Sequence, residues 1–237
     1  MRFKQFLYQE LDSTNAEAQR LIKDGLNQSA AIISQYQLQG RGQKGNCWHS
    51  ENGKNILISI IYFHNNMPTE KQFDISIKSS LGIIDFLDDY SIKAQIKWPN
   101  DILINGKKLA GILIENNVKG RFLSSSIIGI GLNVNQNSFP KELTQAISLN
   151  LITKQTHNLE RDTKLLIEKV LNRLNTNYNQ KSEYLNKLFG FKEYQKYLYK
   201  SEFISASIQD VLSTGELVLQ KEDGSVITCV FKEIQLV

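Results

Sequence analysis

The sequence has few cysteines, few histidines and no long apolar run, and each shortage excludes a class of protein. Cys47 and Cys229 form neither a metal-ligand spacing nor a disulfide framework, so a reducing cytoplasm is expected. No apolar run approaches the length of a membrane span and no apolar signal region opens the chain, so no membrane partner is expected. His49, His64 and His157 share no spacing and are interpreted as surface residues rather than ligands.

The chain also lacks a large excess of either basic or acidic residues. The chain has 28 basic and 24 acidic residues, a formal net charge of +4 over 237 residues. That mild excess gives little support for a nucleic-acid-binding chain, because such chains concentrate basic residues on one face. A hydrophobic content of 41% is ordinary for a globular protein with a sizeable core, and no internal repeat is present. One large domain, or one with a small companion, is therefore expected.

Strands and helices alternate in the first 189 residues, which predicts an α+β fold with a mixed or antiparallel sheet. Helices are expected over residues 13–25, 69–90 and 162–178, and strands over 6–8, 30–36, 55–63, 102–104, 109–115 and 121–133. Thr14 with Glu17, and the stretch 69–72, fit capping boxes, so capping is the plain explanation for the hydroxyls of Ser13 and Thr14. Asn105-Gly106 between two apolar runs predicts a type I′ hairpin.

The pattern changes at about residue 190. Short strands are expected over residues 203–209, 216–221 and 225–231, with glycines marking the turns between them. This pattern predicts a small barrel-like β domain packed on the first. The chain is accordingly divided into residues 1–189 and 190–237.

Three glycines stand within six residues in Gly40-Arg41-Gly42-Gln43-Lys44-Gly45, where bare N–H groups and two cations favour an anion. The stretch also fits the dinucleotide fingerprint, but a β-rich run follows it where a Rossmann site needs a helix. A kinase glycine loop is excluded because no later motif supports one. Taken alone, the stretch is best interpreted as a mobile hairpin that joins two strands.

A second polar group lies about sixty residues later. Trp98-Pro99-Asn100-Asp101 is awkward for the start of a strand, and Lys108 opens an apolar run, where a lysine is costly without an anionic partner. Together with Arg41 and Lys44 these residues supply two or three cations and one carboxylate. Such a set suits activation of a carboxylate by ATP, with Asp101 holding Mg²⁺ or orienting a nucleophile. The glycines of 129–131 indicate that something approaches that strand closely.

These residues resemble the biotin–protein ligases over most of residues 8–135. The matching motifs are Asp12-Ser13-Thr14-Asn15, Gln37 with Gly40-Arg41-Gly42 and Gly45 and Trp48, Lys97-Trp98-Pro99-Asn100-Asp101, Lys108-Leu109-Ala110-Gly111-Ile112-Leu113-Ile114-Glu115, and Gly129-Ile130-Gly131-Leu132-Asn133. Several independent motifs in the right order make chance agreement improbable. The C-terminal part resembles the SH3-like domain of that family, on weaker motifs.

The resemblance implies a two-step reaction with biotin, ATP, Mg²⁺ and a carrier protein. Biotin and ATP would give biotinyl-5′-AMP and pyrophosphate, and biotin would then pass to one lysine of the biotin carboxyl carrier protein of acetyl-CoA carboxylase or a related carboxylase. Because the motifs begin at residue 12, no room is expected for an N-terminal DNA-binding domain, so the monofunctional type, without DNA as a partner, is expected. A homodimer is one oligomeric state that the resemblance leaves open.

The resemblance also implies roles for individual residues. Biotin contacts fall on Ser13, Thr14, Asn15, Gln37, Gly40, Arg41, Gly42, Gln43, Lys108 and Gly111. Contacts with ATP and the adenylate fall on Lys44, Trp48, Asn100 and Asn133. The catalytic residues would be Arg41, Lys108 and Asp101, and Asp101 would also place Mg²⁺.

One departure and two alternatives remain. Many members of the family carry a basic residue where this chain has Gln43, which puts the retention of the adenylate in question. Lipoate ligases share the fold and the adenylation chemistry, but not the pairing of Gly-Arg-Gly with Lys-Trp-Pro-Asn-Asp. A biotin sensor without enzyme activity would require a broken cationic set, and the set is intact.

Overall fold

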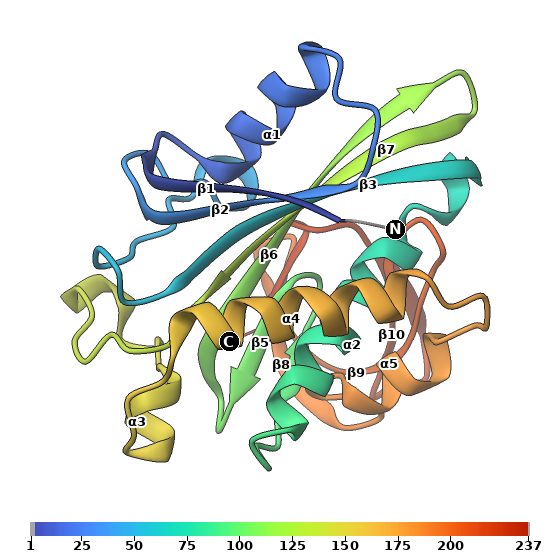
Figure 1. Cartoon of the computed structure of the whole chain (residues 1–237). Helices are drawn as coiled ribbons and strands as arrows, with labels where there is room; N and C mark the ends of the chain where they lie inside the picture. Colours follow the sequence, from blue (N-terminus) through green and yellow to red (C-terminus); the bar gives the residue numbers. More distant parts are fainter. Residues whose placement is uncertain (1–2, 237) are drawn as a thin grey trace.

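A seven-stranded mixed sheet forms the larger layer of this computed structural model, which describes residues 3–236 without the side chain of Lys44. Its strands lie in the order β1-β2-β3-β7-β6-β5-β4 (Figure 1). β1 and β2 run parallel, and each other neighbouring pair is antiparallel, which confirms the α+β fold with a mixed sheet. The strands are β1 (Lys4–Leu11), β2 (Ala30–Gln37), β3 (Ile56–Pro68), β4 (Gln95–Lys97), β5 (Asp101–Ile104), β6 (Lys107–Lys119) and β7 (Phe122–Leu132).

Helices cover both faces of this sheet. α1 (Thr14–Lys23) packs on β2, β3 and β7 on one face, and α2 (Phe73–Asp88) and α4 (Leu159–Leu174) cover the other face (Figure 1). Two short helices, α3 (Leu149–Thr153) and α5 (Lys181–Lys187), were not predicted, because one or two turns carry too little periodicity to register in a sequence. No helix in the described part of the chain is long and apolar enough to cross a membrane.

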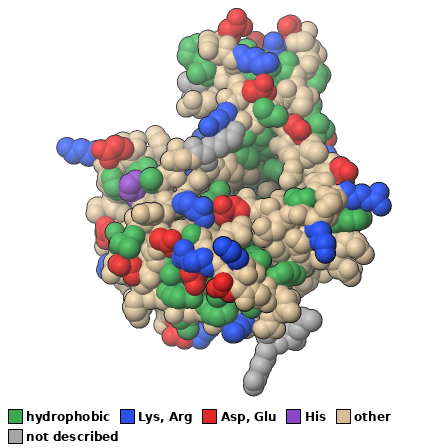
Figure 2. Space-filling model, turned by 90° about the horizontal axis from the view of Figure 1, so that it is seen from above, with side chains coloured by type: hydrophobic (Ala, Val, Ile, Leu, Met, Phe, Trp, Pro, Cys, Tyr) green, Lys and Arg blue, Asp and Glu red, His purple; other side chains and the backbone are tan. Residues whose placement is uncertain are grey.

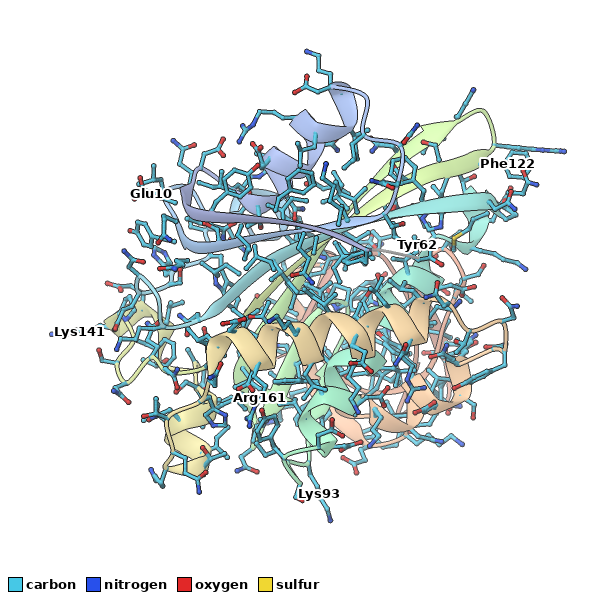
Figure 3. All side chains as sticks on the ribbon, in the orientation of Figure 1. Glu10, Tyr62, Lys93, Phe122, Lys141 and Arg161 are labelled. Atoms are coloured by element: carbon cyan, nitrogen blue, oxygen red, sulfur yellow. The ribbon has the colours of Figure 1, made fainter. Side chains whose placement is uncertain are left out.

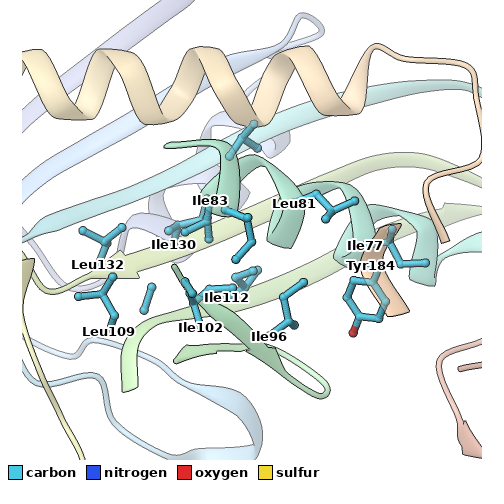
Figure 4. Close-up of a cluster of buried hydrophobic side chains, with 14 of the residues drawn as sticks. Ile77, Leu81, Ile83, Ile96, Ile102, Leu109, Ile112, Ile130, Leu132 and Tyr184 are labelled. Carbon is cyan, nitrogen blue, oxygen red and sulfur yellow. The ribbon is translucent and has the colours of Figure 1, made fainter. Parts of the chain in front are cut away.

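The main core lies between the sheet and α2. Ile112 of β6 and Ile130 of β7 are paired across the strands and point toward α2, where they meet Leu81 and Ile83 (Figure 4). Ile127 points to the opposite face and joins Ala18 of α1. Because successive strand residues alternate between faces, each inner strand buries one set of side chains under α1 and the other under α2.

The hairpin between β5 and β6 forms as predicted. Asn105 and Gly106 have φ angles of 51° and 74°, the positive values that a type I′ turn requires at both central residues. Ile104 pairs with Lys107 and Leu103 with Lys108, and the register then shifts by a bulge. The bulge turns the start of β6 so that Lys108 reaches back to Asp101.

Neither predicted capping box forms, because the hydroxyls that were expected to cap the helices bind partners elsewhere in the chain. α1 begins at Thr14 and α2 at Phe73, and neither N-cap residue makes a side-chain cap hydrogen bond. The hydroxyl of Thr14 instead donates to Gln37 Oε1, and that of Thr69 donates to the Arg121 carbonyl. Tertiary partners therefore outcompete local capping, and the hydroxyls at the start of α1 face a polar ligand site.

The interpretation of all three histidines as surface residues is wrong for His157 and holds only in part for His64. His157 is 8% exposed and its Nδ1 lies 3.4 Å from Asp162, beneath the ring of Tyr90. His64 is half-buried and its Nε2 lies 2.7 Å from Ser126 Oγ, and burial lowers its pKa to about 4. Polar neighbours in the sequence concealed the aromatic and strand packing that encloses these two side chains.

A second, smaller sheet follows from Tyr194 onward. Its antiparallel strands lie in the order β11-β10-β9-β8-β12. They are β8 (Tyr194–Tyr199), β9 (Glu202–Val211), β10 (Leu217–Lys221), β11 (Val226–Cys229) and β12 (Ile234–Leu236), of which β8 and β12 were not predicted. β11 and β12 are the two edges and do not pair, so in the described residues the expected barrel is an open sheet, because the three-residue β12 pairs with β8 instead.

Trp98 joins the two sheets. Its indole Nε1 donates to the Gly215 carbonyl at 3.0 Å, and its ring meets that of Phe231 edge to face at 6.0 Å between centroids. The backbone of the following residues, Asn100 and Asp101, leads directly into β5. Contacts between the sheets thereby fix the position of the polar hairpin that the sequence singled out.

Candidate active site

A cavity of about 400 Å³ lies where the two sheets meet, within the size range of small-molecule sites. Its walls come from the start of α1, the glycine-rich loop, β4 to β7 and the C-terminal sheet. Seen from above, the molecule is hollowed between two lobes, with hydrophobic side chains in the hollow and charged ones around it (Figure 2). The cavity is thus bounded by segments from both ends of the chain.

The floor of the cavity is one row of residues across four strands. The strand register pairs Lys97 with Asp101, Asp101 with Gly111 and Gly111 with Gly131, so these residues share the α1 face of the sheet. A Cβ on Gly131 would overlap the indole ring of Trp48, and one on Gly111 would stand 3.1 Å from that ring. The close approach indicated by the glycines is therefore that of the Trp48 ring to the sheet.

Gly129, two residues before Gly131 on the same face, serves a second side chain. A Cβ there would overlap Asn15 Oδ1. Asn15 uses this space to donate from Nδ2 to Glu115 Oε2 at 2.7 Å and to accept from Ser59 Oγ at 2.6 Å. The glycines of β7 thus admit one side chain from α1 and one from the glycine-rich loop.

Neutral polar groups gather at the α1 end of the cavity. Gln37 Oε1 accepts from the backbone N–H of Thr14 at 2.7 Å and from its hydroxyl at 3.0 Å. The buried hydroxyl of Ser59 lies 2.8 Å from Thr14 Oγ1. These groups fix one another without a charge, so they are suited to an uncharged, hydrogen-bonding ligand group.

Asp12 anchors the turn into this polar group. Its Oδ1 accepts from the backbone N–H of Ser13 at 2.7 Å, and Arg20 binds both carboxylate oxygens. The hydrogen bonds from Arg20 lower the pKa of Asp12 to about 2. The carboxylate therefore remains ionised over the whole physiological range and holds Ser13 at the edge of the cavity.

Two cations, Lys108 on the sheet and Arg41 beside the start of α1, also line the cavity. Lys108 Nζ lies 2.7 Å from Asp101 Oδ1 and 5.6 Å from the centroid of the Trp48 ring. Arg41 makes only long contacts, at 3.4 Å to Ser13 Oγ and 3.4 Å to Glu115 Oε1, and its side chain is 43% exposed. Lys108 is therefore held in place, whereas the loosely held Arg41 can turn toward an anion.

The glycine-rich loop joins β2 to β3, as predicted, and folds back on itself. A 3₁₀ turn over Gln43–Gly45 is closed by a hydrogen bond from Gly42 N to Asn46 O, at 2.7 Å. Trp48 N donates to the carbonyl of Gly40 at 2.9 Å, which completes a small hairpin. This geometry returns the chain to the sheet and lays the Trp48 ring over the glycine row.

The structure brings twelve of the sequence-predicted site residues together. Those that line the cavity are Ser13, Thr14, Asn15, Gln37, Arg41, Gly42, Gln43, Trp48, Asn100, Asp101, Lys108 and Gly111. Gly40 and Asn133 do not line it: Gly40 supports the loop hairpin, and the Asn133 amide donates to the Ile147 carbonyl at 3.1 Å. The side chain of Lys44 lies outside the described residues.

Several site residues were not singled out from the sequence. Ser59 interrupts an apolar strand and Glu115 closes one, so both gave a weak signal as polar residues in buried strands. Phe231, Gln235 and Leu236 line the cavity from the C-terminal sheet, and nothing in their local sequence indicates this. Only the packing of the second sheet on the first places them there.

The donor set limits what metal the site can hold. No group of three or more His, Cys, Asp or Glu side chains suited to a metal occurs in the described residues. Asp101 is the one carboxylate among the described side chains that line the cavity. A single carboxylate fits Mg²⁺ that arrives with substrate phosphates and does not fit a resident metal held by protein alone.

The chain matches one family of known proteins over more than half its length. The sequence model of the biotin/lipoate A/B protein ligase family matches residues 7–133. The bifunctional ligase/repressor BirA of Bacillus subtilis is 37% identical over 136 residues, which are 56% of this chain and 42% of that protein. The biotin–[acetyl-CoA-carboxylase] ligase of Paracoccus denitrificans is 35% identical over 126 residues, 52% of this chain and 51% of that one.

Solved structures match over the whole chain. A biotin protein ligase from Aquifex aeolicus, in complex with biotin and ATP, superposes with a TM-score of 0.79 at 23% identity, covering 99% of this chain and 98% of that one. At that identity the match establishes the fold. The chain spans about half the length of the curated relatives it matches.

Proposed function

Because the chain belongs to the biotin/lipoate A/B protein ligase family, we propose that it activates biotin with ATP and transfers it to a lysine of a carrier protein. The products of the first step are biotinyl-5′-AMP and pyrophosphate. The acceptor is a biotin carboxyl carrier protein of acetyl-CoA carboxylase or a related carboxylase, as the names of relatives such as the Paracoccus denitrificans ligase suggest.

One observation carries this proposal: a single cavity has neutral hydrogen-bonding groups at the start of α1, the weakly held Arg41 beside them, and Lys108 paired with Asp101 on the sheet. Biotin has matching groups, with an uncharged urea at one end and a carboxylate at the other. Ser13, Thr14 and Gln37 suit the urea, and Arg41 and Lys108 suit the carboxylate. The dithiolane of lipoate would leave the polar end without partners, so biotin is the favoured substrate.

In the first step a biotin carboxylate oxygen attacks the α-phosphorus of ATP. The bond from that phosphorus to the bridging oxygen breaks, and its electron pair leaves with pyrophosphate. Both reactants are anionic, so their approach is unfavourable without cations. Lys108 is already fixed by Asp101 and costs no reorganisation, and Arg41 exchanges its weak contacts with Glu115 for the anion.

In the second step the acceptor lysine attacks the acyl carbon of the adenylate, the bond from that carbon to the phosphate oxygen breaks, and AMP leaves. The acceptor lysine reacts as the free amine, and the proton that it loses as the amide forms passes to solvent. Asp101 lines the cavity beside Lys108 and has the one carboxylate among the described side chains there, so it can hold the incoming amine in place. The same carboxylate would contact Mg²⁺ when the ion is bound with ATP, where the ion supplies charge neutralisation of the phosphates.

The adenosine part of the nucleotide is assigned to Trp48, which lines the cavity, and to Asn133, which is buried outside the cavity lining. Asn133 Oδ1 and Trp48 Nε1 are buried and have no hydrogen-bond partner among the described residues. A buried polar atom without a partner is costly and marks a place where a ligand group would be favourable. The roles of Gly40, Lys44 and Asn100 in binding belong to this proposal as well.

We also propose a division of the chain into two domains and a cellular compartment for the protein. Residues 1–189 would form the catalytic domain and residues 190–237 the SH3-like domain; the start of the second sheet at Tyr194 supports that division. Two unpaired cysteines support a reducing compartment such as the cytoplasm. DNA is not among the proposed partners.

The test measures pyrophosphate release by the purified protein with biotin and MgATP, with lipoate as the competing substrate. Biotin-dependent release, followed by labelling of one lysine on an added carrier domain, is the expected result. Release with lipoate at an equal or higher rate would reassign the substrate. Binding of biotin without any pyrophosphate release would instead make the protein a biotin sensor.

A further inference from the structure

Lys97 is a third cation of the cavity, in addition to Arg41 and Lys108, and lies in its floor. It belongs to the row that contains Asp101, Gly111 and Gly131, and it lines the cavity from β4. Its side chain is half-buried. A lysine amine that lines a cavity can donate hydrogen bonds to an anionic ligand bound there.

The three cations of the cavity differ in their partners. Arg41 has Glu115 and Lys108 has Asp101. Among the described residues no carboxylate oxygen lies within 4.0 Å of Lys97 Nζ. Of the cations whose side chains the structure describes in this cavity, Lys97 alone therefore has no carboxylate partner.

The strand order separates Lys97 from the other two cations. β5 lies between β4 and β6, so Asp101 stands between Lys97 on one side and Lys108 on the other. Neighbouring strands are about 4.8 Å apart, which places Lys97 roughly two strand spacings from the strand that carries Lys108. Trp98, which follows Lys97 in the chain, donates from its indole Nε1 to the Gly215 carbonyl. This hydrogen bond holds the backbone at Lys97 in place.

From this arrangement we propose that Lys97 binds the pyrophosphate end of the triphosphate and stabilises it as it leaves. This inference rests on the proposed adenylation. With the carboxylate and α-phosphate at Arg41 and Lys108, the β- and γ-phosphates extend over Asp101 toward Lys97. When the bond to the α-phosphorus breaks, the electron pair stays on pyrophosphate, and Lys97 donates N–H groups to its oxygens.

The experiment compares Lys97→Met, which keeps the length of the side chain without its charge, with Lys97→Arg and the control Lys93→Met. Lys93 is exposed, precedes Lys97 by four residues and points away from the molecule (Figure 3). Three quantities are measured on folded protein: the affinity for inorganic pyrophosphate by calorimetry, its KM in the reverse reaction that regenerates ATP, and biotin transfer from supplied biotinyl-5′-AMP.

Loss of one charge-assisted contact corresponds to about a tenfold to hundredfold change. We expect Lys97→Met to weaken pyrophosphate binding and raise its KM by that factor, to leave transfer from the adenylate within about twofold, and Lys97→Arg to restore most of the loss. Lys93→Met should change none of the three. Pyrophosphate binding unchanged in Lys97→Met, or transfer reduced as strongly as the reverse reaction, overturns the assignment.

Different results contradict the proposed adenylation and the proposed role of Lys97. A wild-type protein that releases no pyrophosphate with biotin and MgATP contradicts the proposed adenylation, before any variant is considered. Calorimetry with inorganic pyrophosphate still tests Lys97 in that case. An active wild type with an unchanged Lys97→Met contradicts only the role of Lys97.

Discussion

Replacing Gly131 by alanine places a methyl group inside the volume of the Trp48 indole ring. The added Cβ would lie less than 3.0 Å from three atoms of that ring, so either the ring or the strand must move. Overpacking of this kind costs typically about 1–3 kcal/mol. For a chain of this length, each kcal/mol lowers the melting temperature by roughly 2–4 °C. We expect Gly131→Ala to melt about 2–12 °C below the wild type.

The same substitution should stabilise the protein once the ring is gone. Gly131 does not have a positive φ, so alanine fits its backbone. A glycine inside a strand is less stable than alanine by roughly 0.5–1 kcal/mol, because the unfolded glycine has more freedom. In a Trp48→Ala background, Gly131→Ala should therefore raise the melting temperature by about 1–4 °C. The sign of the effect reverses between the two backgrounds.

Gly129→Ala provides the matched control. It lies on the same strand and face, but its Cβ would overlap Asn15 rather than Trp48. It should destabilise the protein by a similar amount with or without the indole ring. Thermal unfolding of the four single and double variants, together with the parent proteins, measures both couplings. If Gly131→Ala costs the same free energy in both backgrounds, the Trp48 ring does not lie over Gly131 and the account of the glycine row is wrong.

The remaining predictions concern catalysis, loop order, pH and DNA. Lys108→Ala should lower pyrophosphate release by about a hundredfold, the effect of losing one contact to developing charge, with biotin binding weakened but measurable; release near the wild-type rate would remove Lys108 from the mechanism. Cleavage by a protease within residues 40–52 should slow when biotin and ATP are added, and equal cleavage would count against ordering of the loop. Burial lowers the pKa of His64 from its ordinary 6.5 to about 4, so the unfolded chain binds more protons between these values and stability falls as the pH drops through that window. His64→Gln should flatten that fall, and the exposed His49→Gln should leave it unchanged. A mobility-shift assay should show no saturable DNA complex that survives nonspecific competitor, because a net charge of +4 provides no concentrated basic face.

The sequence predicted the parts of the fold that depend on local pattern. The turn at Asn105-Gly106 is set by two residues that accept positive φ, and the long helices α2 and α4 carry a regular apolar stripe. Short elements such as α3 and β12 depend on what they pack against, so a single chain gives no comparable signal. The prediction of a capping box at Thr14 was wrong because it considered local sequence alone. In the folded chain the Thr14 hydroxyl donates to Gln37, a partner that lies far away in the sequence.

In the site, too, residues with an unusual local sequence context could be predicted, whereas residues placed there only by the fold could not. Residues such as Arg41 and Lys108 were identified because a cation in a glycine-rich loop, or at the start of an apolar strand, is locally anomalous. Lys97 was named only as part of a matching motif and received no role, since a lysine on a short strand is ordinary until the register places it beside Asp101 and inside a cavity. The role proposed for it rests on which charges lack a carboxylate partner, and that property belongs to the assembled site rather than to any segment of the sequence.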